Sequence, residues 1–267
     1  GFGMVQMTRL IELLDEKVEQ LGVACGTLVR CGHVGRVGEW AELVASRGRA
    51  GLVTVNDNGV LKCVAPPGGT EPTLSTNPIA IGVPTGGQPL VLDISTSVVA
   101  NGKVLVQQMA GESCPEGWLL DAEGQPTTDP AVRFSDPRGT LLPMGGYKGF
   151  GLSLLLDILV GGLSGGSCPP AAPDAPGTNN VLLVVWDPER FAGTGHFLGE
   201  ADRVIEFVRG VNRMPDVESI RLAGDRSRET MELRLAEGVP LDGGTWSSLC
   251  ETALGLGVTV PTTETRA

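Results

Sequence analysis

Two apolar runs joined by a short glycine turn constrain the fold of this chain most. The runs Ile79–Val83 and 89–94 are separated only by a segment that contains Thr85, Gly86 and Gly87. A connection this short joins antiparallel strands, because a parallel crossover needs a dozen or more residues. The pair therefore predicts an antiparallel hairpin and excludes a sheet made only of parallel strands.

Amphipathic segments alternate with further apolar runs along the rest of the chain. Apolar residues at helical spacing predict a first helix that ends at Gly22, and strands are expected at 23–29 and 52–56. Together these elements predict an α/β (α+β-like) fold, with a mixed, largely antiparallel sheet surrounded by helices. Further helices are expected at 39–46, 97–109, 149–163, 201–212, 226–237 and 245–254, the last capped by Thr245, and further strands at 118–121 and 181–186.

Length and composition limit the class of protein. The chain has 267 residues, of which 41% are hydrophobic, so it can bury a real core, and we expect a single domain over 1–267. Four prolines within 167–178 predict a loop or flap. A net charge of -11 argues against nucleic acid as a partner, because phosphate binding needs a basic face. A small-molecule partner fits better.

The sequence gives no sign of a membrane or a zinc site. Its longest apolar stretch, 149–162, contains Asp157 and is shorter than a bilayer span requires, and no basic segment followed by an apolar run opens the chain. The six cysteines form no CxxC pair, which favours reduced thiols and no metal. We therefore expect a soluble cytoplasmic protein.

A glycine-rich turn surrounds His33, one of only two histidines in the chain. It lies between an expected strand and an expected helix, where free backbone N–H groups attract anions. Together with Gly35 and Arg36, the imidazole could bind a phosphate or a carboxylate. A tight turn with a solvated histidine fits the same residues.

The same turn invites comparison with the dinucleotide-binding fingerprint of Rossmann folds. Gly32, Gly35 and Gly38 lie between strand and helix, and Asp57 follows about 20 residues later, where an acid that binds ribose belongs. The spacing G-x-x-G-x-x-G nevertheless differs from G-x-G-x-x-G. We therefore do not expect a Rossmann site.

Two more polar turns are candidate sites. Lys148 and Gly149 follow two glycines and lead into an apolar helix, so an ammonium group and backbone N–H groups would converge on an anion. An exposed lysine on a turn is the alternative.

The polar segment after the hairpin could bind ribose or phosphate, or cap a helix that begins at Ser97. It consists of Asp93, Ile94, Ser95, Thr96 and Ser97.

Taken in order, the polar turns resemble the type 2 malate/L-lactate dehydrogenase family over essentially the whole chain. The His33-Val34-Gly35-Arg36 element is most similar to the hydroxycarboxylate dehydrogenase B branch. The motifs that carry the resemblance are GHVGR at 32–36, VAPPGG at 64–69, STNP at 75–78, LDISTS at 92–97, PTTDP at 126–130, PMGGYKG at 143–149, GD at 224–225 and GVPLD at 238–242.

The resemblance implies an oxidoreductase that interconverts a 2-hydroxy acid and a 2-oxo acid with NAD or NADP. It also implies a non-Rossmann NAD(P)-binding fold, a homodimer, and a place for Thr76 near the substrate. The residues that it implies around the cofactor are His33, Gly35, Arg36, Asp93, Ile94, Ser95, Thr96, Ser97, Lys148, Gly149, Asn180, Gly224, Asp225, Arg226 and Ser227.

One family motif has no counterpart here. Members of the family carry an N-terminal helical region whose Ser-His-Gly histidine is the acid/base, whereas this sequence opens on Gly1 without a methionine and contains no Ser-His-Gly. We expect that region to lie upstream and this chain alone to have little activity. Of the two histidines, His196 lies in a loop-like stretch and His33 is a weak candidate. An active dehydrogenase and an incomplete relative that binds nucleotide or a partner subunit both remain open.

Overall fold

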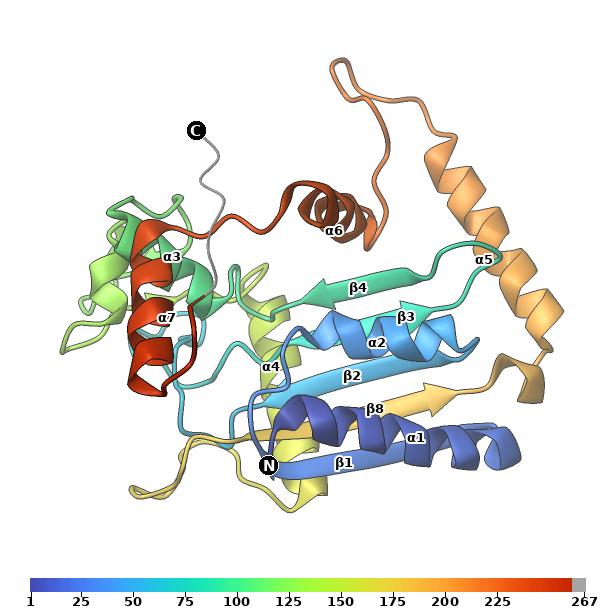
Figure 1. Cartoon of the computed structure of the whole chain (residues 1–267), viewed down its shortest axis with the longest axis horizontal. Helices are drawn as coiled ribbons and strands as arrows, with labels where there is room; N and C mark the ends of the chain where they lie inside the picture. Colours follow the sequence, from blue (N-terminus) through green and yellow to red (C-terminus); the bar gives the residue numbers. More distant parts are fainter. Residues whose placement is uncertain (261–267) are drawn as a thin grey trace.

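The computed structural model describes residues 1–260, and Figure 1 shows how its elements are arranged. Short 3-10 helices lie at Pro130–Arg133 and Pro188–Arg190. The helices are α1 (Gly3–Leu21), α2 (Val37–Ser46), α3 (Asn101–Ala110), α4 (Tyr147–Ser164), α5 (Thr194–Arg209), α6 (Asp225–Glu237) and α7 (Gly243–Gly255). The strands are β1 (Val23–Cys31), β2 (Ala50–Asn56), β3 (Ile79–Val83), β4 (Leu90–Ile94), β5 (Leu119–Leu120), β6 (Pro126–Thr127), β7 (Thr140–Leu141) and β8 (Asn179–Trp186).

The main sheet has five strands in the order β1-β8-β2-β3-β4. The predicted hairpin is confirmed, since β3 and β4 pair antiparallel with Ile81 opposite Leu92. Val53 in β2 pairs with Leu183 in β8 on one side and with Ala80 in β3 on the other. The continuous apolar run of β8 suits a strand that is covered on both faces, by α1 on one face and α4 on the other.

The sheet was expected to be mixed and largely antiparallel. Its antiparallel character is confirmed, but the main sheet is not mixed, because every pair of these strands is antiparallel. The unit β1-α2-β2 looks in sequence like a crossover between adjacent parallel strands. In the structure β8 lies between β1 and β2 and is antiparallel to both, so β1 and β2 run parallel without touching. Parallel pairing among the described residues is limited to an isolated bridge between Val64 and Leu141.

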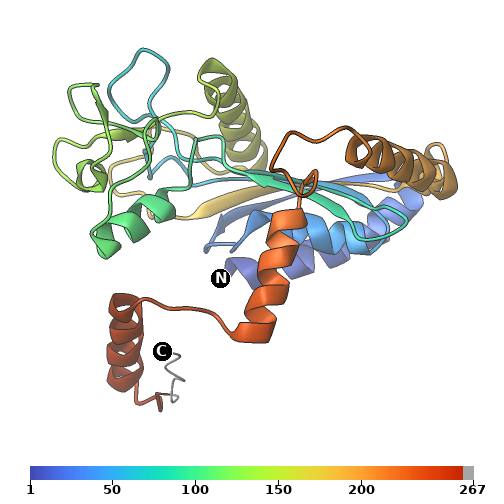
Figure 2. The same ribbon diagram turned by 90° about the horizontal axis from the view of Figure 1, so that it is seen from above.

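Helices cover both faces of the main sheet. Figure 2 shows α1 and α2 on one face and α4 on the other. Met7 and Ile11 of α1 and Trp40 of α2 are buried in the main core, and Leu156 and Val160 are buried on α4. α1 ends at Gly22 as predicted, at a φ of 80° that glycine adopts readily.

A second, smaller sheet, β6-β5-β7, has its own core beside α3. The predicted strand at 118–121 corresponds to β5. Arg133 is buried beside this sheet and donates to the Gly139 carbonyl oxygen at 2.6 Å. After β7 the chain passes the end of β4, where Pro143 forms an isolated bridge with Ser97, and this bridge brings the turn before α4 to the end of β4.

Several expected helix ends lie elsewhere. α3 begins at Asn101 rather than at Ser97, because the Ser97 hydroxyl donates to the Val99 carbonyl at 2.7 Å and closes a turn. Asp242, not Thr245, caps α7, and its carboxylate accepts the Thr245 N–H at 2.8 Å. His196 lies in the first turn of α5 instead of a loop. Residues 167–178 contain no helix or strand.

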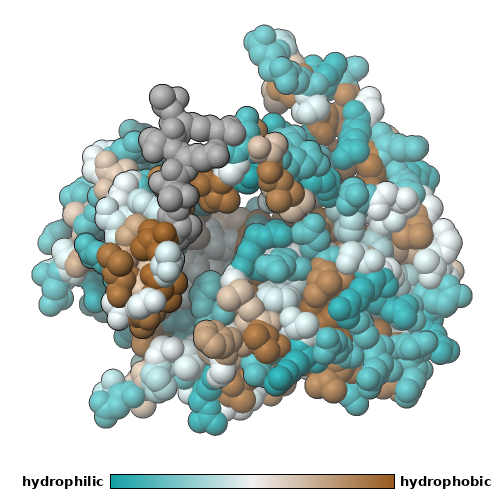
Figure 3. Space-filling model, viewed as in Figure 1, coloured by the Kyte–Doolittle hydropathy of each residue, from teal (hydrophilic) through white to brown (hydrophobic). Residues whose placement is uncertain are grey.

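The helices α5, α6 and α7 have no buried residue, and α6 and α7 project away from the sheet in Figure 2. Large apolar side chains on them are exposed, among them Phe207, Leu235 and Leu254. Figure 3 shows such side chains gathered on α7. Exposed apolar surface of this extent is typical of a contact with another chain or segment.

α4 has the length and apolar composition of a helix that crosses a membrane. A third of its 18 residues are buried inside the fold, where it packs on β8 and β2. Its buried face contains Asp157. The core helix of a soluble protein passes the same test, so the length of α4 is weak evidence for a membrane.

Candidate functional site

The His33 turn and the end of β4 meet at the start of α2. Arg36 precedes the first turn of α2, and its Nη1 lies 3.8 Å from Asp93 Oδ2 and its Nη2 2.8 Å from Glu42 Oε2. A Cβ on Gly38 would lie 2.6 Å from Asp93 Oδ2, so only glycine lets Asp93 approach so closely. The structure therefore joins two predicted cofactor segments that are far apart in sequence.

The His33 ring is exposed and its orientation is fixed by its own turn. Its Nδ1 accepts the Gly35 N–H at 3.0 Å, and Gly35 has a φ of 76°. A nitrogen that accepts a hydrogen bond carries no proton, so the neutral ring carries its proton on Nε2. The Trp40 Nε1–H donates to the Val34 carbonyl at 2.8 Å and anchors the turn in the core.

Thr96 joins three of the predicted motifs. Its N–H and Oγ1 donate to the Thr76 carbonyl at 3.0 and 2.8 Å, and its own carbonyl accepts the Met144 N–H at 2.9 Å. A Cβ on Gly149 would lie 2.6 Å from the Thr96 carbonyl oxygen, so this contact with α4 also requires glycine. We call the contact of these three segments the Thr96 junction.

The hydroxyl groups beside Thr96 are engaged locally. Ser95 Oγ donates to the Ser97 carbonyl at 2.8 Å, and Ser97 Oγ lies 3.1 Å from Ser95 Oγ. Ser97 is buried, whereas Ile94 and Ser95 are half-buried. These two serines therefore shape the turn, and Asp93 is the exposed member of the segment.

Lys148 lies in the first turn of α4, which begins two residues before the expected start. Its side chain is exposed, and no acidic group among residues 1–260 forms an ion pair with it. No side chain caps α2 or α4. In α4 the Lys148 and Gly149 N–H groups donate to the Gly145 and Met144 carbonyls at 3.4 and 2.8 Å, so this helix start offers an anion chiefly the Lys148 ammonium group. In α2 the Glu39 N–H donates to the Arg36 carbonyl at 3.2 Å, and the N–H groups of the two residues before it lie next to the Arg36 side chain.

The Gly224 turn lies on the outer edge of β4. The Val91 N–H donates to the Ala223 carbonyl at 3.3 Å, and Gly224 has a φ of 96°. Asp225 then accepts the Leu222 N–H at 2.9 Å. β4 therefore contacts both this turn and, through Asp93, the turn that contains Arg36.

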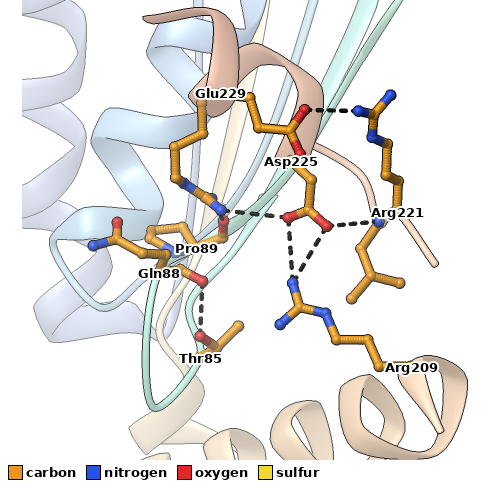
Figure 4. Close-up of polar contacts among 9 residues, drawn as sticks. Thr85, Gln88, Pro89, Arg209, Arg221, Asp225 and Glu229 are labelled. Atoms are coloured by element: carbon orange, nitrogen blue, oxygen red, sulfur yellow. Dashed lines mark hydrogen bonds and ion pairs between the residues drawn. The ribbon is translucent and has the colours of Figure 1, made fainter. Parts of the chain in front are cut away.

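Asp225 connects α5 to α6. Its carboxylate accepts hydrogen bonds from Arg209 at 3.3 Å and Arg228 at 3.4 Å, and Figure 4 shows it facing Arg209. Burial by itself raises the pKa of Asp225, but the Leu222 N–H and the two guanidinium groups lower it below its ordinary value. Arg226 and Ser227 are exposed beside it.

A groove of about 1010 Å³ lies between the end of α5 and α6. Arg213 and Glu232 help to line it, and of the predicted cofactor residues only Asp225 does. The groove therefore adjoins the Gly224 turn but contains no residue of the Thr96 junction.

Comparison with known proteins identifies the family of this chain. The family model of malate/L-lactate dehydrogenase matches residues 1–250. A malate dehydrogenase of Pyrococcus abyssi is 35% identical over 97% of this chain and 73% of its own length. A hydroxycarboxylate dehydrogenase B of Escherichia coli K12 is 34% identical over 97% of this chain and 72% of its own length. The chain belongs to the malate/L-lactate dehydrogenase family.

Solved structures agree with this membership. A putative malate/lactate dehydrogenase from E. coli superimposes with a TM-score of 0.88 at 33% identity, covering 97% of this chain and 73% of that one. Six of the similar relatives are named malate, L-lactate, L-sulfolactate or hydroxycarboxylate dehydrogenases, names that describe reactions between 2-hydroxy and 2-oxo acids. Another, from Agrobacterium fabrum and 34% identical over 91% of this chain and 71% of its own length, is named a Δ1-pyrroline-2-carboxylate reductase. As a family member, this chain is an oxidoreductase of the 2-hydroxy acid dehydrogenase type.

Within this family member, Asn180 stands apart from the other predicted residues. It is fully buried, and its Nδ2 donates to Asn56 Oδ1 at 2.8 Å while its Oδ1 accepts the Arg30 N–H at 3.0 Å. Its side chain is thus occupied by the protein itself. Contact between Asn180 and a cofactor stays a prediction.

Sequence analysis missed a buried polar network that adjoins the Thr96 junction at Asn77, the residue after Thr76. Asp157 of α4 accepts the Asn56 Nδ2 and the Asn77 Nδ2, each at 2.7 Å. Asn77 also donates to Ser153 Oγ at 3.0 Å. The signal in the sequence was Asp157 itself, the single charge within the expected apolar helix at 149–163, which was given no role there.

Asp57 lies at the rim of this network. Its carboxylate accepts the Gly59 N–H at 3.0 Å and the Leu61 N–H. Burial raises the pKa of Asp57 to about 6, and the nearby charge of Asp157 adds to the increase, while the two N–H groups oppose it. Asp57 therefore titrates in a range where most carboxyl groups are already ionised.

Proposed function

We propose that this chain binds NAD or NADP at the Thr96 junction and uses it to interconvert a small 2-hydroxy acid and its 2-oxo acid. The observation that carries the proposal is the junction itself, where the turn with Thr76, the end of β4 and the start of α4 meet. The resemblance assigns one of these segments to the substrate and the other two to the cofactor. A reaction between the two ligands requires that contact.

The residues at this site suit the diphosphate of a dinucleotide. Arg36 and Lys148 supply positive charge at two helix starts that no side chain caps. The starts of α3 and α6 also lack a capping side chain and carry Lys103 and Arg226 in their first turns. What distinguishes α2 and α4 is their contact with the end of β4, through Asp93 in one case and Thr96 in the other. Asp93 holds the Arg36 guanidinium toward the end of β4.

The sheet supports a mode of binding outside the Rossmann pattern. A Rossmann crevice forms at the carboxyl ends of adjacent parallel strands, and the main sheet contains only antiparallel pairs. The proposed dinucleotide instead lies over the end of β4 and the starts of α2 and α4. When bound, its nicotinamide ring gives or takes the hydride.

Proton transfer needs a donor close to the substrate oxygen. Within this sequence His33 is the better placed of the two histidines, because its turn contacts the end of β4 through Arg36. His196 lies on α5, next to the short helix at Pro188–Arg190. The family resemblance places the acid/base on a Ser-His-Gly histidine, a motif that this sequence does not contain, so variants of His33 test whether His33 takes that role here.

We further propose that the protein acts as a soluble cytoplasmic homodimer. The outward side of α4 exposes Leu155, Ile158 and Leu163, each by more than half of its surface, and α7 exposes Leu254. Between residues 154 and 163 of α4 every exposed residue is uncharged. Two copies could therefore pair there without a like-charge contact.

Titration with NADH and with NADPH tests this function, followed by turnover assays with glyoxylate, pyruvate, oxaloacetate and an aromatic 2-oxo acid. We expect saturable binding of at least one cofactor. Binding without turnover would favour the incomplete relative, and no binding at millimolar cofactor would remove the cofactor assignment.

A further inference from the structure

Asp157 is a fully buried carboxylate and the single acidic residue of the largely apolar helix α4. Each of its side-chain oxygens accepts an amide N–H, Oδ1 from Asn56 and Oδ2 from Asn77, both at 2.7 Å. Burial of a charge costs free energy that these hydrogen bonds offset. A position that only needed to fill the core would be occupied by an apolar residue.

Asn77 is held in place by the donor end of its side chain. Its φ is 26°, a backbone conformation that side-chain-bearing residues rarely adopt. Its Nδ2 contacts three acceptors, namely Asp157 Oδ2, Ser153 Oγ and the Ser153 carbonyl, whereas its Oδ1 is buried without a partner in residues 1–260. Contacts from α4 therefore fix this turn in a conformation that it would not adopt alone.

The same helix holds the neighbouring segment at its other end. Thr76 precedes Asn77 and accepts both hydrogen bonds from Thr96, and the Thr96 carbonyl lies against Met144 and Gly149 at the start of α4. The contacts form a closed path that runs from α4 through Asn77, Thr76 and Thr96 back to α4. A change at Asp157 should therefore be transmitted to Thr76.

We infer that Asp157 is a positioning residue that fixes Thr76 for contact with the 2-oxo acid and, one step further along the path, Thr96 for contact with the cofactor. The inference rests on the proposed function, because it takes the Thr76 turn as the place of the substrate. It predicts a graded effect. Substrate binding should suffer more from a change at Asp157 than cofactor binding does, since Asn77 adjoins Thr76 directly and reaches Thr96 only through it.

The substitution Asp157→Asn tests the inference while keeping the size of the side chain. It replaces one accepting oxygen by an NH₂ group, so one of the two asparagine amides then faces a donor. The measurements are the Kd of NADH or NADPH, the Kd of oxamate at saturating cofactor, and Tm. We expect the Kd of oxamate to rise about tenfold or more and the Kd of the cofactor to rise less.

A double variant restores the contact with its polarity reversed. In Asp157→Asn/Asn77→Asp the donor and the acceptor exchange places, and position 157 keeps one oxygen for Asn56. We expect the Kd of oxamate to return to within about threefold of the wild-type value, because double-mutant coupling reports a direct contact. Asp174→Asn makes the same chemical change in the exposed loop at 167–178 and should leave all three measurements unchanged.

Each result decides the inference. If Asp157→Asn binds oxamate with an unchanged Kd, the inference is overturned and the proposed function stands. The same conclusion follows if the Kd of oxamate and the Kd of the cofactor rise equally and in step with the fall in Tm. If the single variant is insoluble, the double variant decides. Oxamate binding by the double variant supports the inference, and a double variant that binds no oxamate overturns the inference. A wild-type chain that binds cofactor but no oxamate removes the substrate contact at Thr76 and the inference with it. A wild-type chain that binds neither cofactor overturns the inference and the proposed function together.

Discussion

Arg36 Nη1 lies 3.8 Å from Asp93 Oδ2, and the backbone of Gly38 passes directly beside this pair. The arginine precedes α2 and the aspartate belongs to β4, so the contact joins the first predicted cofactor turn to the second. It requires a residue without a side chain at position 38. Binding at this site can therefore be tested without touching either charged group.

Gly38→Ala should weaken dinucleotide binding. The added Cβ would lie 2.6 Å from Asp93 Oδ2 and 2.8 Å from Arg36 Nη1, so both side chains must move. We expect a loss of stability of about 1–3 kcal/mol from overpacking, together with a higher Kd for NADH or NADPH. Gly102→Ala in α3 has open space around it and should leave binding unchanged. Equal Kd values for Gly38→Ala and the wild type would place the dinucleotide elsewhere.

Lys148→Ala should raise the Kd of the cofactor by about tenfold to a hundredfold, the range for loss of a charge-assisted hydrogen bond to phosphate. Titration of the variant and the wild type at two ionic strengths gives both Kd values. The ratio of the two Kd values should be smaller at high salt, because salt screens the contact between charges. Lys103→Ala removes an exposed lysine from α3 and serves as the control. If both variants bind alike, Lys148 does not contact the cofactor.

His33→Gln should lower kcat by about 10²- to 10⁴-fold and leave the Kd of the cofactor unchanged, if His33 supplies the proton. His196→Gln should have no effect on either constant. Stopped-flow oxidation of NADH with the best 2-oxo acid gives both values. Turnover that survives in His33→Gln would assign the proton to another group, and an inactive wild-type chain that gains activity with a Ser-His-Gly segment would assign it to that histidine.

Asp57 makes stability depend on pH in a defined window. Its pKa is raised from an ordinary 3.8 to about 6, so between these values the folded state keeps a proton that the unfolded chain has lost. The free energy of unfolding should therefore fall as pH rises through this window and then level off. Asp57→Asn removes this contribution. Urea unfolding at pH 4.5 and 6.5 measures the slope, and an identical slope in both proteins would contradict the assignment.

The exposed apolar residues of α4, α5 and α7 predict self-association. Light scattering should give twice the chain mass of 27.8 kDa. A monomer at high concentration would show that this chain alone does not form the interface.

Local patterns predicted much of this fold, and contacts distant in sequence decided the rest. The hairpin of β3 and β4 was predictable because its turn and both runs lie within 16 residues. The antiparallel place of β8 was not, because β8 enters between β1 and β2 more than 120 residues after β2. The expected helix at Ser97 failed for a local reason, since its hydroxyl closes a turn where a cap was expected.

The candidate site shows the same division. The turns that contain Arg36, Thr96 and Gly149 were recognised by resemblance, and the structure shows how they meet. Asp157 was not recognised, because a single acid in an apolar helix gives no hint of its partners until Asn56 and Asn77, about 100 and 80 residues away, are seen against it.

Hydrogen–deuterium exchange with and without saturating NADH or NADPH tests the central claim most directly. The account predicts slower exchange in three segments, at 32–38, 93–97 and 144–150, because the cofactor would cover the starts of α2 and α4 and the end of β4 together. Slower exchange confined to the groove at 209–232, with none at the Thr96 junction, would contradict it.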